Sequence, residues 1–118
     1  MSKSQNYPTS VTYDGYTREL ALQSVGVGWA PLINEVFDKL ETIKGQIKII
    51  QVKEKWGGLR IYTDYANEEL DTVIRSAEER SYEICEVSGK PGKLRNCNGW
   101  YRVLSDEHGA QYPLVKNP

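Results

Sequence analysis

The sequence has little of the chemistry that metal centres, disulfide frameworks and acid–base catalysts use. It contains two cysteines, one histidine, one phenylalanine and one methionine. Cys85 and Cys97 are too few for a secreted disulfide framework, and a reducing compartment would keep both as thiols. Apolar runs are only a few residues long, and the first residues lack the apolar core of a secretory signal. These absences predict a cytoplasmic chain without a membrane anchor, a structural disulfide or a cofactor.

An excess of either charge is also missing. Lysine and arginine number 15 and aspartate and glutamate 16, so the net charge of −1 predicts no general attraction to nucleic acid or anionic membrane. With 118 residues, of which 39% are hydrophobic, the chain can form one compact domain without a metal to stabilise it. Eight tyrosines and three tryptophans carry polar atoms suited to a wet surface. This composition favours a binding protein.

Helical spacing and capping residues predict three helices. Thr17 caps a short helix that Gly26 ends, and a second helix begins at Pro31 and stops at Gly45. A third covers residues 67–83, with an asparagine cap and acidic residues in its first turn. All three carry apolar residues on one face, which must pack against another layer of the fold.

Two hairpins complete the predicted fold. Residues 47–62 are rich in β-branched and aromatic residues and are interrupted at Trp56-Gly57-Gly58, which predicts two strands joined by a tight turn. Short strands also flank the Asn98-Gly99 turn. We therefore expect an α+β fold in which the helices pack on a small antiparallel sheet.

Four segments together resemble a known group of sequences: Gly28 to Leu32, Val52 to Tyr62, Cys85 to Gly92, and Gly99 to His108. The chain resembles, over residues 28–108, a group of small phage-encoded proteins of uncharacterised function. That resemblance implies a C-terminal zinc-ribbon-like knuckle, in which two pairs of Cys or His ligands hold one metal ion. From this resemblance and the sequence pattern together, we expect a single domain, 1–118, with an arm or loop (1–16), a helix-helix-hairpin-helix core (17–83), the knuckle (84–108) and a tail (109–118).

The knuckle departs from the family pattern. Ser88 and Ser105 stand where the pattern has cysteine, and only Cys85 and His108 occupy matching positions. Serine hydroxyls are poor zinc ligands because they must lose a proton at high pKa, and Cys97 would supply at most a third ligand. We therefore expect a degenerate knuckle without metal, in which the two serines form hydrogen bonds instead.

The first candidate ligand site is the Trp56-Gly57-Gly58 turn with Arg60. Trp56 offers a stacking face, adjacent glycine amides can approach an anion, and Arg60 presents a planar fork for phosphate. The alternative is that the glycines only reverse the hairpin and that Trp56 covers the core.

The second candidate site is the C-terminal hairpin, whose basic and aromatic residues are Lys93, Arg95, Trp100 and Arg102. Strand alternation places Trp100 and Arg102 on one face, where they can form a clamp for a base and its phosphate, and Tyr101 on the other. The alternative is an exposed hairpin that Trp100 anchors to the core.

Catalysis is not expected. Ser105, Asp106 and His108 are of the right types for a triad, but they are crowded into four residues, and the only histidine has no evident orienting partner.

The leading hypothesis is a phage accessory protein that sequesters a nucleotide or cyclic-nucleotide signal of host defence, and such proteins are often homo-oligomers. Two alternatives remain: an inhibitor or adaptor that binds a host protein through the acidic third helix or the N-terminal arm, and a nucleic-acid-binding module that uses residues 90–102.

Overall fold

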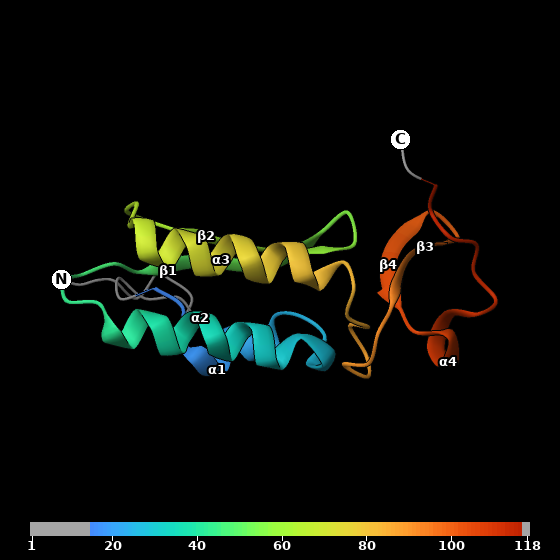
Figure 1. Cartoon of the computed structure of the whole chain (residues 1–118), viewed down its shortest axis with the longest axis horizontal. Coiled ribbons are helices and arrows are strands. Elements are labelled where there is room, and N and C mark those ends of the chain that lie inside the picture. Colours follow the sequence, from blue (N-terminus) through green and yellow to red (C-terminus); the bar gives the residue numbers. More distant parts are fainter. Residues whose placement is uncertain (1–14, 117–118) are drawn as a thin grey trace, which may run out of the picture.

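The computed structural model describes residues 15–116, so most of the predicted N-terminal arm lies outside the described part of the chain. Its elements are α1 (Arg18–Gln23), a 3-10 turn η2 (Val27–Trp29), α2 (Ala30–Thr42), β1 (Ile49–Lys55), β2 (Gly58–Thr63), α3 (Glu68–Ser81), β3 (Lys93–Cys97), β4 (Trp100–Leu104) and α4 (Asp106–Gly109). Figure 1 shows α1, α2, α3 and the first hairpin along the long axis, with β3, β4 and α4 at one end. Within residues 15–116, no helix has the length and apolar character needed to cross a membrane.

The predicted helix starts are confirmed by their caps. The Thr17 side chain accepts a hydrogen bond of 3.0 Å from the Leu20 amide, and the Asn67 side chain accepts one of 2.9 Å from the Leu70 amide. Pro31 lies in the first turn of α2, where its missing N–H has no helical partner to lose. Local sequence therefore determines where these three helices begin.

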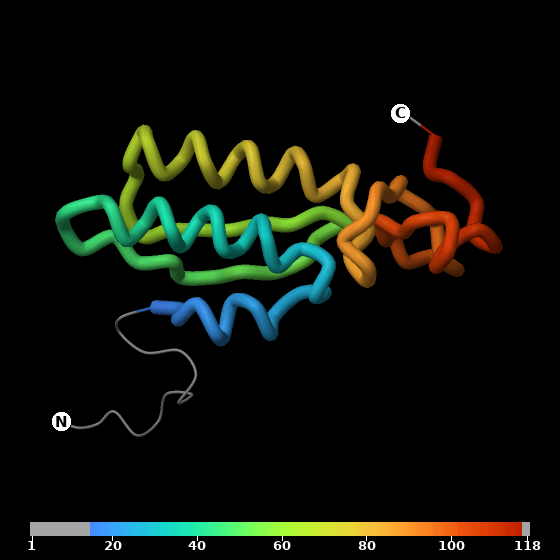
Figure 2. The backbone as a smooth tube through the Cα atoms, turned by 60° about the horizontal axis from the view of Figure 1, so that its bottom comes forward, coloured from blue at the N-terminus to red at the C-terminus, as the bar shows by residue number. Residues whose placement is uncertain are grey.

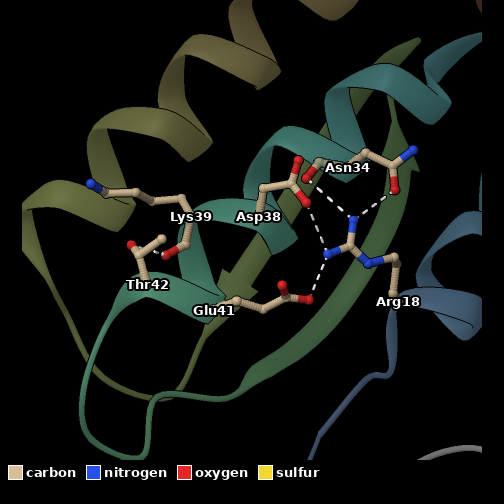
Figure 3. Close-up of polar contacts among 6 residues, drawn as sticks. All are labelled: Arg18, Asn34, Asp38, Lys39, Glu41 and Thr42. Atoms are coloured by element: carbon tan, nitrogen blue, oxygen red, sulfur yellow. Dashed lines mark hydrogen bonds and ion pairs between the residues drawn. The ribbon is translucent and has the colours of Figure 1, made fainter.

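Arg18 attaches the short helix α1 to α2 (Figure 3). Its guanidinium donates to the Asn34 side chain at 2.9 Å and pairs with Asp38 at 3.0 Å and Glu41 at 2.7 Å. It also lies 5.6 Å from the centre of the Phe37 ring. One side chain thus fixes the orientation of a helix that is too short to be stable alone.

The first hairpin has two distinct faces. In the register of β1 and β2, Val52 lies opposite Ile61 on the buried face, and Lys53 lies opposite Arg60 on the outer face. The buried face packs with residues of α2 and α3 into the main core, whose largest fully buried side chains are Trp29, Leu32, Ile33, Ile49, Leu59 and Leu70. The Trp29 indole also donates to the Ile84 carbonyl at 2.8 Å.

The predicted single sheet is in fact two separate two-stranded sheets, β1–β2 and β3–β4. On the β2 side of the first sheet, α3 covers the free edge. The Leu59 amide donates to the Ser81 hydroxyl at 3.0 Å, and the Ile61 amide donates to the Glu78 carboxylate at 2.9 Å. With these edge groups satisfied by side chains, no further strand can pair there.

Replacing Ser81 by alanine should lower the free energy of unfolding by about 1–3 kcal/mol, because it leaves the buried Leu59 amide without an acceptor. Urea unfolding followed by circular dichroism measures the change. Ser76→Ala, on the same helix, is the matched control and should have little effect. Equal midpoints for the two variants would contradict the edge-covering role of Ser81.

The β3–β4 hairpin is packed against the end of the helical layer, as the two views in Figures 1 and 2 agree. The Gly28 amide donates to the Glu86 carbonyl at 2.7 Å, and a Cβ at position 28 would collide with the Cys85 carbonyl. Val103 of β4 belongs to the main core. The C-terminal hairpin therefore shares the core instead of forming an independent unit.

Candidate functional site

Trp56 occupies an unfavourable backbone conformation on the surface. Trp56 and Gly57 have φ values of 54° and 89°, which define a turn with two left-handed residues. The Asn98-Gly99 turn has nearly the same values, 59° and 97°, with asparagine at the position where Trp56 stands. The Trp56 ring is 69% exposed and contacts Tyr101 edge-on at a centroid distance of 6.2 Å. The interpretation of Trp56 as a cover of the core is therefore wrong.

The two glycines of this turn have a packing role. A Cβ at Gly57 would lie 2.5 Å from Leu94 Cδ1, and a Cβ at Gly58 would overlap the Tyr82 ring. The Gly57 amide already donates to the Glu54 carboxylate at 2.7 Å. The glycines therefore allow the turn to fit between α3 and the second hairpin, and the structure gives no support to an anion site on the Gly57 amide.

Arg60 positions Tyr82. Its guanidinium donates to the Leu59 carbonyl at 2.9 Å and to the Tyr82 hydroxyl at 2.8 Å, and it lies 5.7 Å from the centre of the Tyr82 ring. These contacts leave part of the guanidinium available on the outer face of the hairpin, where the side chain is half-buried. Arg60 thus belongs to the same group of contacts as the Trp56 turn.

A cleft of about 430 Å³ opens beside this turn. It lies between the end of α3, the start of β3 and the segment after α4, and its lining includes Tyr82, Glu83, Lys93, Leu94, Leu114 and Val115. Two of these, Tyr82 and Leu94, are the residues against which the turn glycines pack. Lys93 is the one predicted site residue that lines the cleft directly.

Arg95 is buried and serves the fold. Only 5% of the residue is exposed, and its guanidinium donates to the carbonyls of Leu104 at 3.1 Å and Gly109 at 2.8 Å. A third contact joins it to the Asp106 carboxylate at 2.6 Å. The structure therefore gives no support to the predicted ligand-binding role of Arg95, because most of its donors are used by the end of β4 and the segment that follows it.

Trp100 and Arg102 are on the opposite face of β4 from Tyr101, the residue that contacts Trp56. Trp100 is 75% exposed, so it does not anchor the hairpin to the core. Arg102 pairs with Glu86 at 3.2 Å, and that contact raises the pKa of the guanidinium further above its usual value. The register confirms that Tyr101 faces the other way from Trp100, and it is Tyr101 that contacts Trp56. No clamp between Trp100 and Arg102 is evident.

The predicted knuckle brings Cys85 and two serines together. Cys85 is fully buried, and its sulfur accepts a hydrogen bond of 3.4 Å from the Ser88 amide. The Ser105 hydroxyl is also buried and makes no hydrogen bond of ordinary geometry among the described residues, although it lies close enough to the sulfur to favour the thiolate. Burial raises the pKa of the Cys85 thiol, but donors from Ser88 and Ser105 outweigh it and lower the pKa to about 6.

These groups do not form a set of metal ligands. Among residues 15–116, no three His, Cys, Asp or Glu side chains are grouped so that they could hold a metal ion. Burial raises the pKa of the Cys97 thiol above its ordinary value, in contrast to Cys85. The knuckle therefore contains one thiol, Cys85, whose pKa is raised by burial but lowered overall by the neighbouring donors of Ser88 and Ser105.

The site residues that sequence reasoning missed are Tyr82, Leu94 and Tyr101. Each is half-buried and comes from a different element, and they meet only because the turn at residues 56–58 fits between them. The excess of tyrosine over phenylalanine was the one available signal, and it does not indicate which tyrosines take part.

Comparisons of this chain with known protein families, with curated proteins and with solved structures find no match. Its function is therefore argued from the geometry of the site.

Proposed function

We propose that this protein is a non-catalytic binding protein for a nucleotide-like ligand, that is, a phosphorylated small molecule that carries a flat base. The ligand binds where the Trp56 turn, Tyr82 and the start of β3 meet. The observation that supports this proposal most strongly is the Trp56 side chain, which is large, exposed and held at positive φ.

Trp56 has two features that oppose stability. A bulky residue in the left-handed region costs about 1–2 kcal/mol, and most of its ring gains nothing from burial. The chain uses the favourable asparagine at the corresponding position of its other hairpin, so the fold itself does not require tryptophan here. An exposed indole beside Tyr101 is suited to stacking against a base.

The adjacent cleft supports the same class of ligand. Its volume falls within the usual range of small-molecule sites, roughly 300–1,000 Å³. The Tyr82 ring and the Leu94 side chain provide apolar contact, the Lys93 ammonium suits a phosphate, and the Glu83 carboxylate can accept from the amino group of a base. The resemblance to phage-encoded proteins favours, within this class, a nucleotide signal of host defence.

The other two hypotheses receive less support. On the acidic helix α3, Glu78 holds the edge of β2 and Glu69 pairs with Lys39 at 3.2 Å, so part of its charge serves the fold. In the basic segment 90–102, Arg95 is buried and Arg102 is paired with Glu86. On each surface, part of the charge is therefore already used within the fold.

Trp56→Asn tests the proposal because it should make the protein more stable and, at the same time, weaken its binding of nucleotides. Asparagine suits the left-handed turn position, so the free energy of unfolding should rise by about 1 kcal/mol. Loss of the stacking ring should weaken nucleotide binding about tenfold or more. A panel of nucleotides and cyclic nucleotides is screened by thermal shift, and affinities are then measured by isothermal titration calorimetry.

Trp100→Asn is the control, since it removes an equally exposed tryptophan that is on the opposite face of β4 from Tyr101. It should leave the affinity unchanged. If the unaltered protein binds nothing in the panel, or if Trp56→Asn binds as tightly as the unaltered protein, the proposed function is wrong.

A further inference from the structure

The outer face of the first hairpin carries an unusual concentration of positive charge. The register places three cross-strand pairs on this face: Gln51 opposite Tyr62, Lys53 opposite Arg60, and Lys55 opposite Gly58. The buried face is occupied by apolar pairs such as Val52 opposite Ile61. The outer face of β1 and β2 therefore combines three cations with no acidic side chain.

Lys53 and Arg60 form a like-charged pair directly across the two strands, an arrangement that destabilises a sheet. Within residues 15–116, none of the three cations of this face is in an ion pair, although six other Lys and Arg side chains are: Arg18, Lys39, Arg80, Lys90, Arg95 and Arg102. No ion pair therefore compensates the three charges of this face, and five other Lys and Arg side chains among residues 15–116 are likewise outside the ion pairs. An anionic partner would remove the repulsion.

Aromatic side chains lie at both ends of this basic face. Trp56 is 69% exposed at the turn, and Tyr62 is 40% exposed near the far end of β2. Gly58 and Tyr62 are separated by roughly 13 Å along the strand, from a rise of about 3.3 Å per residue. A base in a stacked strand occupies only about 3.4 Å. The face is therefore longer than one nucleotide.

We propose that the outer face of β1 and β2 continues the Trp56 site and binds a single-stranded oligonucleotide, with phosphates on Lys53, Lys55 and Arg60 and bases stacked on Trp56 and Tyr62. This inference rests on the proposed function, because it assigns to the same site a ligand of several nucleotides. Proteins that bind single-stranded nucleic acid combine cationic and aromatic side chains in this way. Every base has a face that can stack on a ring, and every phosphate linkage carries a negative charge.

The test compares ligands of increasing length on the full chain. Fluorescence anisotropy measures the binding of labelled oligothymidylates and oligoadenylates, and calorimetry measures the binding of the corresponding mononucleotides. Oligonucleotides should bind at least tenfold more tightly than mononucleotides at low salt. Their affinity should fall as salt increases, with a slope of about −0.7 for each phosphate neutralised.

Lys53→Gln should weaken oligonucleotide binding several-fold and make the salt slope shallower by about 0.7, while mononucleotide binding at the Trp56 turn stays the same. Lys44→Gln is the matched control: it makes the same change of charge outside β1 and β2 and should alter neither measurement.

The outcomes distinguish the two proposals. Binding of mononucleotides with no gain for oligonucleotides overturns the extended site and leaves the proposed function standing. Tight oligonucleotide binding that Lys53→Gln does not change also overturns the assignment to this face. Absence of binding to either kind of ligand overturns both.

Discussion

Replacing Arg95 by leucine should lower the free energy of unfolding by about 3–5 kcal/mol, the largest loss we expect from any single polar substitution. The guanidinium is the common donor to the carbonyls of Leu104, Gly109 and Tyr112, at 3.1, 2.8 and 3.3 Å, and to the Asp106 carboxylate. Without it, the carbonyls of Leu104, Gly109 and Tyr112 each lose a donor, and the Gly109 carbonyl keeps only the Tyr112 amide at 2.9 Å. Urea unfolding and amide hydrogen exchange of residues 104–112 measure the loss.

The control for this prediction is Asp106→Asn. The Asp106 side chain is 93% exposed, so its ion pair with Arg95 contributes little, and the variant should lose about 1 kcal/mol or less. If Arg95→Leu is no more destabilising than Asp106→Asn, Arg95 is not the group that holds α4 and the following segment to β3.

Stability should rise with pH between about 6 and 9 because of Cys85. Its pKa is about 6 in the folded protein, against an ordinary value of 9.0, since Ser88 and Ser105 provide donors to the sulfur that outweigh burial. A group with a lowered folded pKa binds more protons when unfolded, so its stabilisation is complete above pH 9 and is lost as pH falls through 6. The expected slope is about 1.4 kcal/mol per pH unit at most.

Denaturant unfolding across this pH range measures the effect, and the ultraviolet absorbance of the thiolate reports the titration directly. Cys85→Ala should remove this part of the pH dependence, whereas Cys97→Ala should retain it because burial raises the pKa of Cys97 instead. Identical slopes for Cys85→Ala and the unaltered protein would show that Cys85 is an ordinary thiol.

Three helices, α1, α2 and α3, and both turns could be predicted because their signals are local, whereas α4 was not predicted. Thr17 and Asn67 each accept a bond from an amide three residues later, so neither cap depends on distant residues. The Asn98-Gly99 turn depends on two adjacent residues that tolerate positive φ. The serines of the knuckle were also expected to form hydrogen bonds: the Ser88 hydroxyl accepts one from the Lys90 amide at 3.2 Å, whereas the Ser105 hydroxyl makes none of ordinary geometry among the described residues.

The candidate site could not be predicted to the same extent, because exposure depends on residues far away in the chain. Arg95 and Arg102 are on the same face of neighbouring strands, yet α4 and the segment after it cover only the first of them. Similarly, three tryptophans have equal apolar character, and the structure buries Trp29 while it leaves Trp56 and Trp100 exposed.

The sequence by itself determined the starts of α1, α2 and α3, the two hairpin turns and the alternation of faces along each strand, because hydrogen bonds and backbone preferences within a few residues specify them. Tertiary structure alone decided that Ser81 and Glu78 cover the free edge of β2 and that the Trp56 ring lies beside Tyr101. Those outcomes depend on which elements, distant in sequence, pack together. The residues near each position in the sequence do not indicate which side chains that packing will bury.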